Sequence, residues 1–415
     1  MGQPLINITR KQAMVFAAFL VLYEFLTYIA NDMIMPGMLK VVSSFNAPES
    51  AIATSLTTYI MGGASLQLFL GPLSDRYGRR PVMIAGALIF FLFTALIASS
   101  NSMSQFLAAR FFQGMGLCFI GVIGYATLQE IFAEMDAIRL ISIMANVAIL
   151  APLAGPLVGG AFVDYFSWRW IFILIDIFAL FALWGLWQFM PEPIGQTKRN
   201  GEKIHSISLS PKIVATNYKK LLVNPSFILG SLAVGLMSLP CVAWIGLSPI
   251  MLVTDAKLSN IQYGLWQLPI FGATILGNWF LQRLTRHGSL KKILLIGSLL
   301  LVLGLLVVYG LPLISNDYFI SLIPGLIIYF FGLGIASAPL NRLILFSTSV
   351  SKGTASALLS MIAMCVQAIG VEIANILYKS HSNMVFALYC ASIGIIYFIC
   401  LCGAIFFTDT TRLPH

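Results

Sequence analysis

The feature that most constrains this chain is the recurrence of apolar runs that are each long enough to cross a lipid bilayer. A helix needs about 20 apolar residues to span a hydrocarbon core about 30 Å thick, and we count about twelve such runs. Hydrophobic residues make up 59% of the 415 residues and charged residues only 9%, against roughly 25% charged residues in a soluble domain. The runs are about twice as long as the strands of a membrane barrel. The sequence therefore predicts an all-α integral membrane protein.

The runs fall into two groups of six on either side of one long polar stretch. The predicted domains are an N-terminal six-helix half (1–190), a cytoplasmic linker (191–224) and a C-terminal six-helix half (225–415). Within the linker, Ser210-Pro211 and the spaced apolar residues after it suit a short amphipathic helix on the membrane surface, and a flexible linker is the open alternative. The predicted spans are 13–37, 50–73, 81–99, 104–128, 139–163 and 168–190, followed by 225–254, 261–284, 291–313, 317–345, 353–379 and 383–408.

The basic residues predict the orientation of the chain. They cluster in the breaks between apolar runs, so the net charge of +9 indicates membrane topology and not a nucleic-acid partner. Placing both termini in the cytoplasm leaves about four basic residues outside. We expect no metal site, because the six cysteines fall inside apolar runs without ligand spacing. We expect no cofactor and no enzymatic activity, because the sequence has neither a phosphate-binding loop nor a nucleophile motif. The basic residues expected outside are Lys40, Arg169, Lys257 and Lys379.

A weak internal repeat relates the two groups of helices. The stretch 71–86, GPLSDRYGRRPVMIAG, follows the second predicted span, and a degenerate relative, RLTRHGSLKKILLIG (283–297), follows the eighth. Secondary transporters are often built from two related halves with the substrate site between them, near the middle of the bilayer. The repeat therefore favours a transporter.

Two glycine-containing motifs predict places where helices meet and move. In the loop 71–81, Gly71 is expected to allow close helix approach and Gly78 a tight turn, while Asp75 and Arg79 are expected to form an ion pair that breaks and reforms. In 151–160, APLAGPLVGG, the glycines remove side chains where a neighbouring helix can pack, and the prolines permit bending.

The first predicted span carries two acids, Glu24 and Asp32, with Tyr28 midway between them. A spacing of four residues places all three on one slowly turning stripe, with a drift of about 40° per step. An ionised carboxylate is costly at membrane depth, so such a residue faces a cavity, pairs with a cation or takes up a proton. Pro36 is expected to bend or end this helix. We expect Arg110 to be held by Gln113, one turn away, and by an acid of the first helix.

The loop 71–81, the stretch 151–160 and the motif Leu107-x-x-Arg110-x-x-Gln113-Gly114-x-Gly116 together resemble the major facilitator superfamily, in particular its drug/proton antiporter branch and most closely the MdfA-type multidrug transporters. The resemblance covers essentially the whole chain. It implies twelve transmembrane helices in two six-helix halves in a bacterial inner membrane. It also implies proton-coupled efflux of lipophilic cationic and neutral drugs by alternating access. A monomer is the expected state.

The resemblance also implies roles for individual residues. Proton coupling is expected at Glu24, Asp32 and Arg110. The expected substrate-binding residues are Glu24, Tyr28, Asn31, Asp32, Leu56, Gln113, Ala148 and Ile149. The expected conformational switch comprises Asp75, Arg79, Gly155, Pro156 and Gly159.

Two further acids and two further functions stay open from the sequence. Asp176, in the sixth predicted span, is a hydrogen-bonded polar residue in the favoured interpretation, and a third proton site or a lumen-facing group in the others. Glu372 is interpreted as an interfacial charge near the outer face. The alternative to multidrug efflux is a proton-coupled exporter of one metabolite or siderophore on the same scaffold. A transporter-like sensor or scaffold without transport activity would be expected to have lost the two acids or the Asp75 loop.

Overall fold

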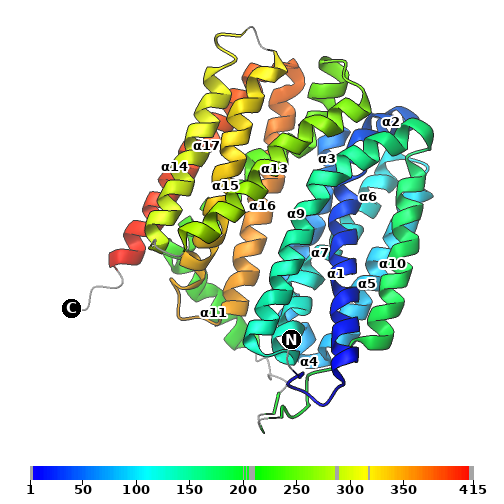
Figure 1. Ribbon diagram of the computed structural model, residues 1–415, viewed down its shortest axis with the longest axis vertical. Helices are drawn as coiled ribbons and strands as arrows, with labels where there is room; N and C mark the ends of the chain where they lie inside the picture. The colour runs from blue at the N-terminus through cyan, green and yellow to red at the C-terminus, as the bar shows by residue number, and fades with distance from the viewer. Residues whose placement is uncertain are drawn as a thin grey trace.

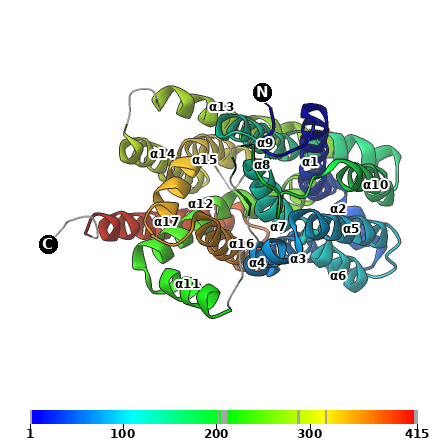
Figure 2. The ribbon, with the colours of Figure 1, turned by 90° about the horizontal axis from the view of Figure 1, so that it is seen from below.

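The computed structural model describes residues 3–199, 201, 203–204, 211–285, 289–315 and 318–410. Within these ranges the secondary structure is helical apart from one isolated bridge between Thr197 and Lys203. Figure 1 shows the helices α1 to α10 on one side of the molecule and α12 to α17 on the other, and Figure 2 shows the same two groups from below. The predicted all-α fold is confirmed.

The first group of helices forms six membrane crossings in the described part of the chain. The first crossing is α1 (Arg10–Asp32), η1 (Met35–Gly37) and α2 (Met38–Ser44), and the second is α3 (Ala51–Ser65) with α4 (Gln67–Tyr77). The third is α5 (Arg79–Ala98), and the fourth comprises α6 (Met103–Gly114), α7 (Gly116–Phe119), η2 (Ile120–Gly124) and α8 (Tyr125–Ile131). The fifth and sixth are α9 (Glu134–Tyr165) and α10 (Arg169–Phe189).

The second group forms six more crossings in the described residues. They are α12 (Pro225–Ser248) with η3 (Pro249–Asp255), α13 (Asn260–Leu284), α14 (Leu290–Gly310), η4 (Phe319–Ser321) with α15 (Leu322–Leu345), α16 (Lys352–Leu377) with η5 (Tyr378–Ser380), and α17 (Asn383–Thr410). Ten of the twelve crossings meet a length and hydropathy criterion for membrane spans. The other two are the α3–α4 crossing, which is interrupted at Leu66, and α13, which carries polar residues such as Gln267 and Asn278.

The helix boundaries follow the predicted spans with two informative differences. The first crossing begins earlier than predicted, because the Oγ1 atom of Thr9 accepts a hydrogen bond from the backbone N–H of Gln12 at 3.2 Å and caps α1. The chain then breaks at η1, which contains Pro36 as expected, and continues to Ser44. In the linker the structure contains helix α11 (Pro211–Val223), while Ser210 lies outside the described residues.

The two groups of helices touch mainly through α9 against α13 and α3 against α16. Glycines allow the first contact: a Cβ atom added to Gly160 would lie 2.4 Å from the backbone oxygen of Asn260, and one added to Gly264 would lie 2.5 Å from the Cα atom of Leu157. The Nδ2 atom of Asn260 also donates a hydrogen bond to the Oδ1 atom of Asp164 at 2.6 Å. The stretch 151–160 therefore packs directly against the other half.

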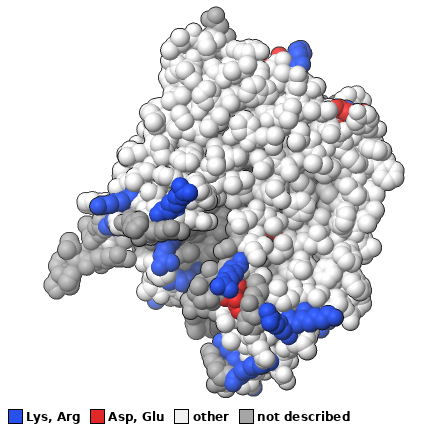
Figure 3. All heavy atoms as spheres, viewed as in Figure 1, with Lys and Arg blue, Asp and Glu red and all other residues white. Residues whose placement is uncertain are grey.

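Charge is distributed unevenly over the molecule. Figure 3 shows most of the Lys and Arg side chains of the visible face gathered toward the lower end, where α11 lies in Figure 1. The interior holds few charged groups, since only five charged side chains are buried among the described residues. These are Glu24, Asp32, Arg79, Arg110 and Asp136.

Candidate functional site

Two of the buried charged residues are the acids of α1. Glu24 is 2% exposed and Asp32 is 4% exposed. The Oη atom of Tyr125, on α8, donates a hydrogen bond to the Oε1 atom of Glu24 at 2.8 Å. The Oε2 atom of Glu24 is buried and has no hydrogen-bond partner among the described residues. This carboxyl oxygen can therefore accept a proton, a hydrogen bond or a cation.

Arg110 lies fully buried on α6 in a polar network with α1. Its Nη1 atom donates to the Oε1 atom of Gln113 at 2.7 Å, as expected, and its Nη2 atom donates to the Oδ1 atom of Asn31 at 2.6 Å. The Nδ2 atom of Asn31 in turn donates to the Oδ1 atom of Asp32 at 3.2 Å. The expected acid of the first helix, Asp32, makes no direct ion pair with Arg110 in the described residues and is linked to it through Asn31. Asn31 lies between the guanidinium and the carboxyl group.

Side chains from four crossings fix this network in place. The guanidinium of Arg110 lies over the ring of Tyr59, with its carbon 4.3 Å from the ring centroid. The Oη atom of Tyr59 donates to the backbone oxygen of Thr27 at 2.5 Å, and the Nε2 atom of Gln113 donates to the Oγ1 atom of Thr94 at 2.9 Å. Tyr59, Thr94 and Tyr125 were not predicted from the sequence. Their contacts hold α1, α3, α5 and α6 together at the level of the acids.

The other predicted substrate-binding residues are more widely placed. Tyr28, between the acids on α1, is 36% exposed. Leu56 is buried and packs with Ile60 and Ala368, so it belongs to an apolar cluster where α3 meets α16. Ala148 and Ile149 are half-buried on α9. The structure therefore brings Asn31, Asp32, Arg110 and Gln113 into one polar network. It leaves Glu24 outside that network, bonded to Tyr125, and it places Leu56 at the contact between the halves.

The glycines of α9 bring this helix against the acid-bearing end of α1. A Cβ atom added to Gly155 would lie 2.9 Å from the Cβ atom of Asp32. One added to Gly159 would lie 1.9 Å from the backbone oxygen of Met33. The opposite side of the same stretch contacts α13, since the Cβ atom added to Gly264 would also lie 3.0 Å from the oxygen of Pro156. The stretch 151–160 therefore connects Asp32 with the second half of the molecule.

The loop 71–81 forms an ionic cluster that is more extensive than predicted. The Nη1 atom of Arg79 lies 2.6 Å from the Oδ1 atom of Asp75, as expected, and the Nη2 atom lies 2.8 Å from the Oε1 atom of Glu130 on α8. The carboxyl group of Glu192 accepts hydrogen bonds from the backbone N–H groups of Arg79 and Arg80 at 3.0 and 2.9 Å. Glu130 and Glu192 were not predicted as partners.

The two glycines of this loop differ. Gly78 makes the expected turn with a φ of 102°, and a Cβ atom there would lie 2.4 Å from the Oε2 atom of Glu192. Gly71 does not mark the expected close approach, because a Cβ atom there would meet its nearest atom at an ordinary 3.9 Å. The turn, and not the helix before it, therefore requires glycine.

Neither of the two remaining acids matches its favoured interpretation fully. Asp176 has a buried Oδ1 atom without a hydrogen-bond partner among the described residues, so the interpretation as a hydrogen-bonded polar residue is wrong for this oxygen. The Oε2 atom of Glu372 accepts a hydrogen bond from Asn375 at 3.3 Å, while its Oε1 atom is buried and has no partner in the described part of the chain. Glu372 is therefore not simply a solvated charge.

Two groups of six crossings that meet beside buried acids and a buried arginine define a secondary transporter. A family model described as Major Facilitator Superfamily matches residues 20–371. Proteins named Multidrug transporter MdfA from Yersinia pestis bv. Antiqua (strain Angola) and Escherichia coli O157:H7 are each 44% identical to this chain over 387 residues, covering 93% of it and 93% and 92% of the relatives. The chain belongs to the major facilitator superfamily and, within it, to the group of MdfA multidrug transporters, which confirms the resemblance of its motifs.

Solved structures show the same fold at low sequence identity. A D-xylose-proton symporter superposes with a TM-score of 0.70 at 15% identity, covering 93% of this chain and 96% of that chain. A bacterial homologue of the human lysosomal transporter Spinster, in an inward-facing and unoccupied conformation, gives a TM-score of 0.69 at 13% identity, with 98% of each chain covered. These matches show that the overall fold is shared.

Proposed function

We propose that this protein exports lipophilic cationic and neutral small molecules from a bacterial cell in exchange for protons, by alternating access. It acts as a monomer in the inner membrane, with both termini in the cytoplasm. The names of its relatives, Multidrug transporter MdfA, support the substrate class. The gathering of basic side chains toward one end supports the orientation.

The observation that carries this proposal is the pair of buried acids on α1. Neither Glu24 nor Asp32 forms an ion pair with Arg110 in the described part of the structure, although all three are buried. An ionised carboxylate without a direct cationic partner is costly at membrane depth. A proton or a cationic substrate can remove that cost, and the two compete for the negative charge of this pair of acids. This competition is the physical basis of antiport.

The two acids have different surroundings, which suggests a division of roles. Glu24 keeps one oxygen without a partner, next to the partly exposed ring of Tyr28, and in our proposal it receives the positive charge of a cationic substrate. Asp32 is linked to Arg110 through Asn31 and in our proposal it carries the coupled proton. Gly155 contacts Asp32 closely. In our proposal, a change in the protonation of this carboxyl group therefore moves α9, which contacts the second half.

Transport in proteoliposomes with an imposed pH gradient tests the proposal. We expect uptake driven by the gradient for several chemically unrelated lipophilic compounds. Glu24→Gln is expected to impair transport of a cation such as tetraphenylphosphonium much more than transport of a neutral compound, because only the cation needs a negative partner. The control Glu49→Gln removes an acid outside the helices and is expected to transport both compounds normally.

Two results would contradict the proposal. Uptake that does not respond to the pH gradient would exclude proton antiport. Transport of a single compound and none of the others would favour the dedicated exporter of one metabolite or siderophore.

A further inference from the structure

Helix α11 of the linker lies at the end of the molecule that is cytoplasmic in the proposed orientation (Figure 1 and Figure 2). It packs against α12 and α16 of the second half. Only Asn224 separates α11 from α12, and the Oδ1 atom of Asn224 caps α12 by accepting the N–H of Phe227 at 3.2 Å. The side chain of Leu221, near the end of α11, is fully buried. The linker helix is therefore fixed to the second half.

One hydrogen bond of α11 crosses to the first half. The Oη atom of Tyr218 donates to the backbone oxygen of Leu68, on α4, at 3.1 Å. Tyr218 is half-buried, so water competes only in part for this bond. Next to Leu68, the Nε2 atom of Gln67 donates to the Sδ atom of Met364 on α16 at 3.9 Å. The first turn of α4 is therefore held both by the linker helix and by α16.

The sequence of α4 explains why the oxygen of Leu68 accepts this bond. In an α-helix a backbone oxygen accepts a hydrogen bond from the N–H group four residues later. For Leu68 that residue is Pro72, which lies inside α4 and has no N–H group. A backbone oxygen that loses its helical donor needs another one when it lies away from water. Tyr218 supplies the donor that Pro72 lacks.

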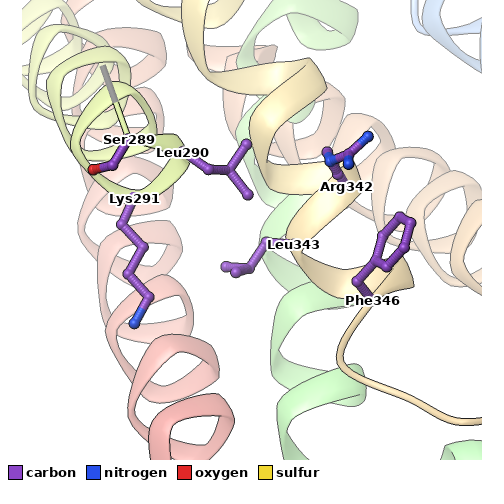
Figure 4. A pocket seen from close by; sticks show the side chains of 6 residues that line it. All are labelled: Ser289, Leu290, Lys291, Arg342, Leu343 and Phe346. Atoms are coloured by element: carbon purple, nitrogen blue, oxygen red, sulfur yellow. The ribbon is translucent and has the colours of Figure 1, made fainter. Parts of the chain in front are cut away.

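A cavity at the same end of the molecule lies outside this contact. It has a volume of about 380 Å³ and lies between α14 and α15 (Figure 4). Both of its walls belong to the second half, so a movement of one half against the other does not need to open or close it. The lining residues are Ser289, Leu290, Lys291, Arg342, Leu343 and Phe346.

We propose that Tyr218 is a latch between the two halves, through which the linker helix favours the state that is closed to the cytoplasm. This inference rests on alternating access, which is part of the proposed function. When the cytoplasmic end opens, α4 moves away from α11 and α16, so the bond between Tyr218 and Leu68 breaks. Tyr218 is a positioning residue in this account, because it lies on α11 and acts through the contact with α4.

Hydrogen–deuterium exchange of the full-length protein in nanodiscs, without substrate, tests the latch. Tyr218→Phe removes only the hydroxyl group. It is expected to speed exchange of the amides in 352–364, the part of α16 next to α4, by about fivefold, the effect of losing one hydrogen bond between neutral groups. Exchange in 260–264, where α13 contacts α9 at the opposite end, is expected to slow, because opening one end closes the other. The amides of 290–294, beside the cavity, are expected to stay unchanged.

The matched control is Tyr389→Phe. The hydroxyl group of Tyr389 also donates to a backbone oxygen, that of Gly370, at 2.7 Å, but both residues belong to the second half. The control variant therefore loses the same type of bond without loss of a contact between the halves. It is expected to leave exchange in 352–364 and in 260–264 as in the wild-type protein.

Three results would overturn the proposal. Faster exchange confined to α11 in Tyr218→Phe would show that the bond anchors only the linker helix. Unchanged exchange in 352–364 would show that the bond does not hold the halves together. The same change in Tyr389→Phe would indicate a general loss of packing. A wild-type protein that does not export drugs in proteoliposomes, but shows the expected exchange at both ends on loss of the Tyr218 hydroxyl, would contradict the proposed function and support the latch.

Discussion

Replacing Asn31 by alanine removes the side chain that stands between Arg110 and Asp32. The variant loses the 2.6 Å hydrogen bond from the guanidinium and the weaker 3.2 Å bond to the carboxyl group. A hydrogen bond to a charged group contributes about 1.5 to 3 kcal/mol, and the fully buried guanidinium loses an acceptor that water cannot easily replace. We therefore expect the free energy of unfolding to fall by about 2 to 4 kcal/mol.

A matched control separates this network from the general effect of losing an asparagine. Asn341, on α15, donates one hydrogen bond to the backbone oxygen of Ser337 at 2.9 Å and has no charged partner among the described residues. Asn341→Ala is expected to cost about 1 kcal/mol or less. The free energy of unfolding is measured by steric trapping in bicelles for both variants. If Asn31→Ala were no more destabilising than Asn341→Ala, our account of how Arg110 is held in the membrane would be wrong.

Three further predictions concern the contacts around the site and the topology. Gly159→Ala is expected to abolish transport, because the added Cβ atom would lie 1.9 Å from the backbone oxygen of Met33, directly after α1, whereas Gly272→Ala, which meets nothing within 4 Å, should transport normally in the same proteoliposome assay. Glu130→Gln is expected to weaken the contact of Arg79 with α8 and to lower the melting temperature in detergent, and an unchanged melting temperature would show that this ion pair adds no stability. A cysteine introduced at Thr197 should react with an impermeant maleimide only from the cytoplasmic side, and labelling from outside intact cells would reverse the proposed orientation.

The sequence predicted the helical crossings because membrane spans depend on local composition. A run of about 20 apolar residues is a strong signal that does not need tertiary contacts. The interruptions at Pro36 and Gly78 were predicted for the same reason, since each residue restricts or permits backbone angles by itself. The extension of the first crossing to Ser44 was missed, because it follows a break within the crossing.

The partners of the buried charges could not be predicted in the same way. Tyr125 lies 101 residues from Glu24, and Glu130 lies 51 residues from Arg79. No local pattern connects such pairs, so only the three-dimensional structure identifies them. The position of Asn31 between Arg110 and Asp32 depends on side-chain rotation within one helical turn, which residue spacing does not determine. One signal was present in the sequence. Glu130 and Glu192 lie near the ends of predicted spans, as Arg79 does, and could have been considered as its partners.

The most direct test of the central claim is the release of protons when a lipophilic cation binds. Purified protein in lightly buffered detergent is mixed with tetraphenylphosphonium, and the change in pH is recorded with a fluorescent indicator. We predict that the wild-type protein releases protons, that Asp32→Asn releases fewer, and that the double variant Glu24→Gln with Asp32→Asn releases none while it still binds neutral hydrophobic ligands. Proton release by the double variant at the wild-type level would contradict the account, because the proton would then have to come from another group, such as Asp176 or Glu372.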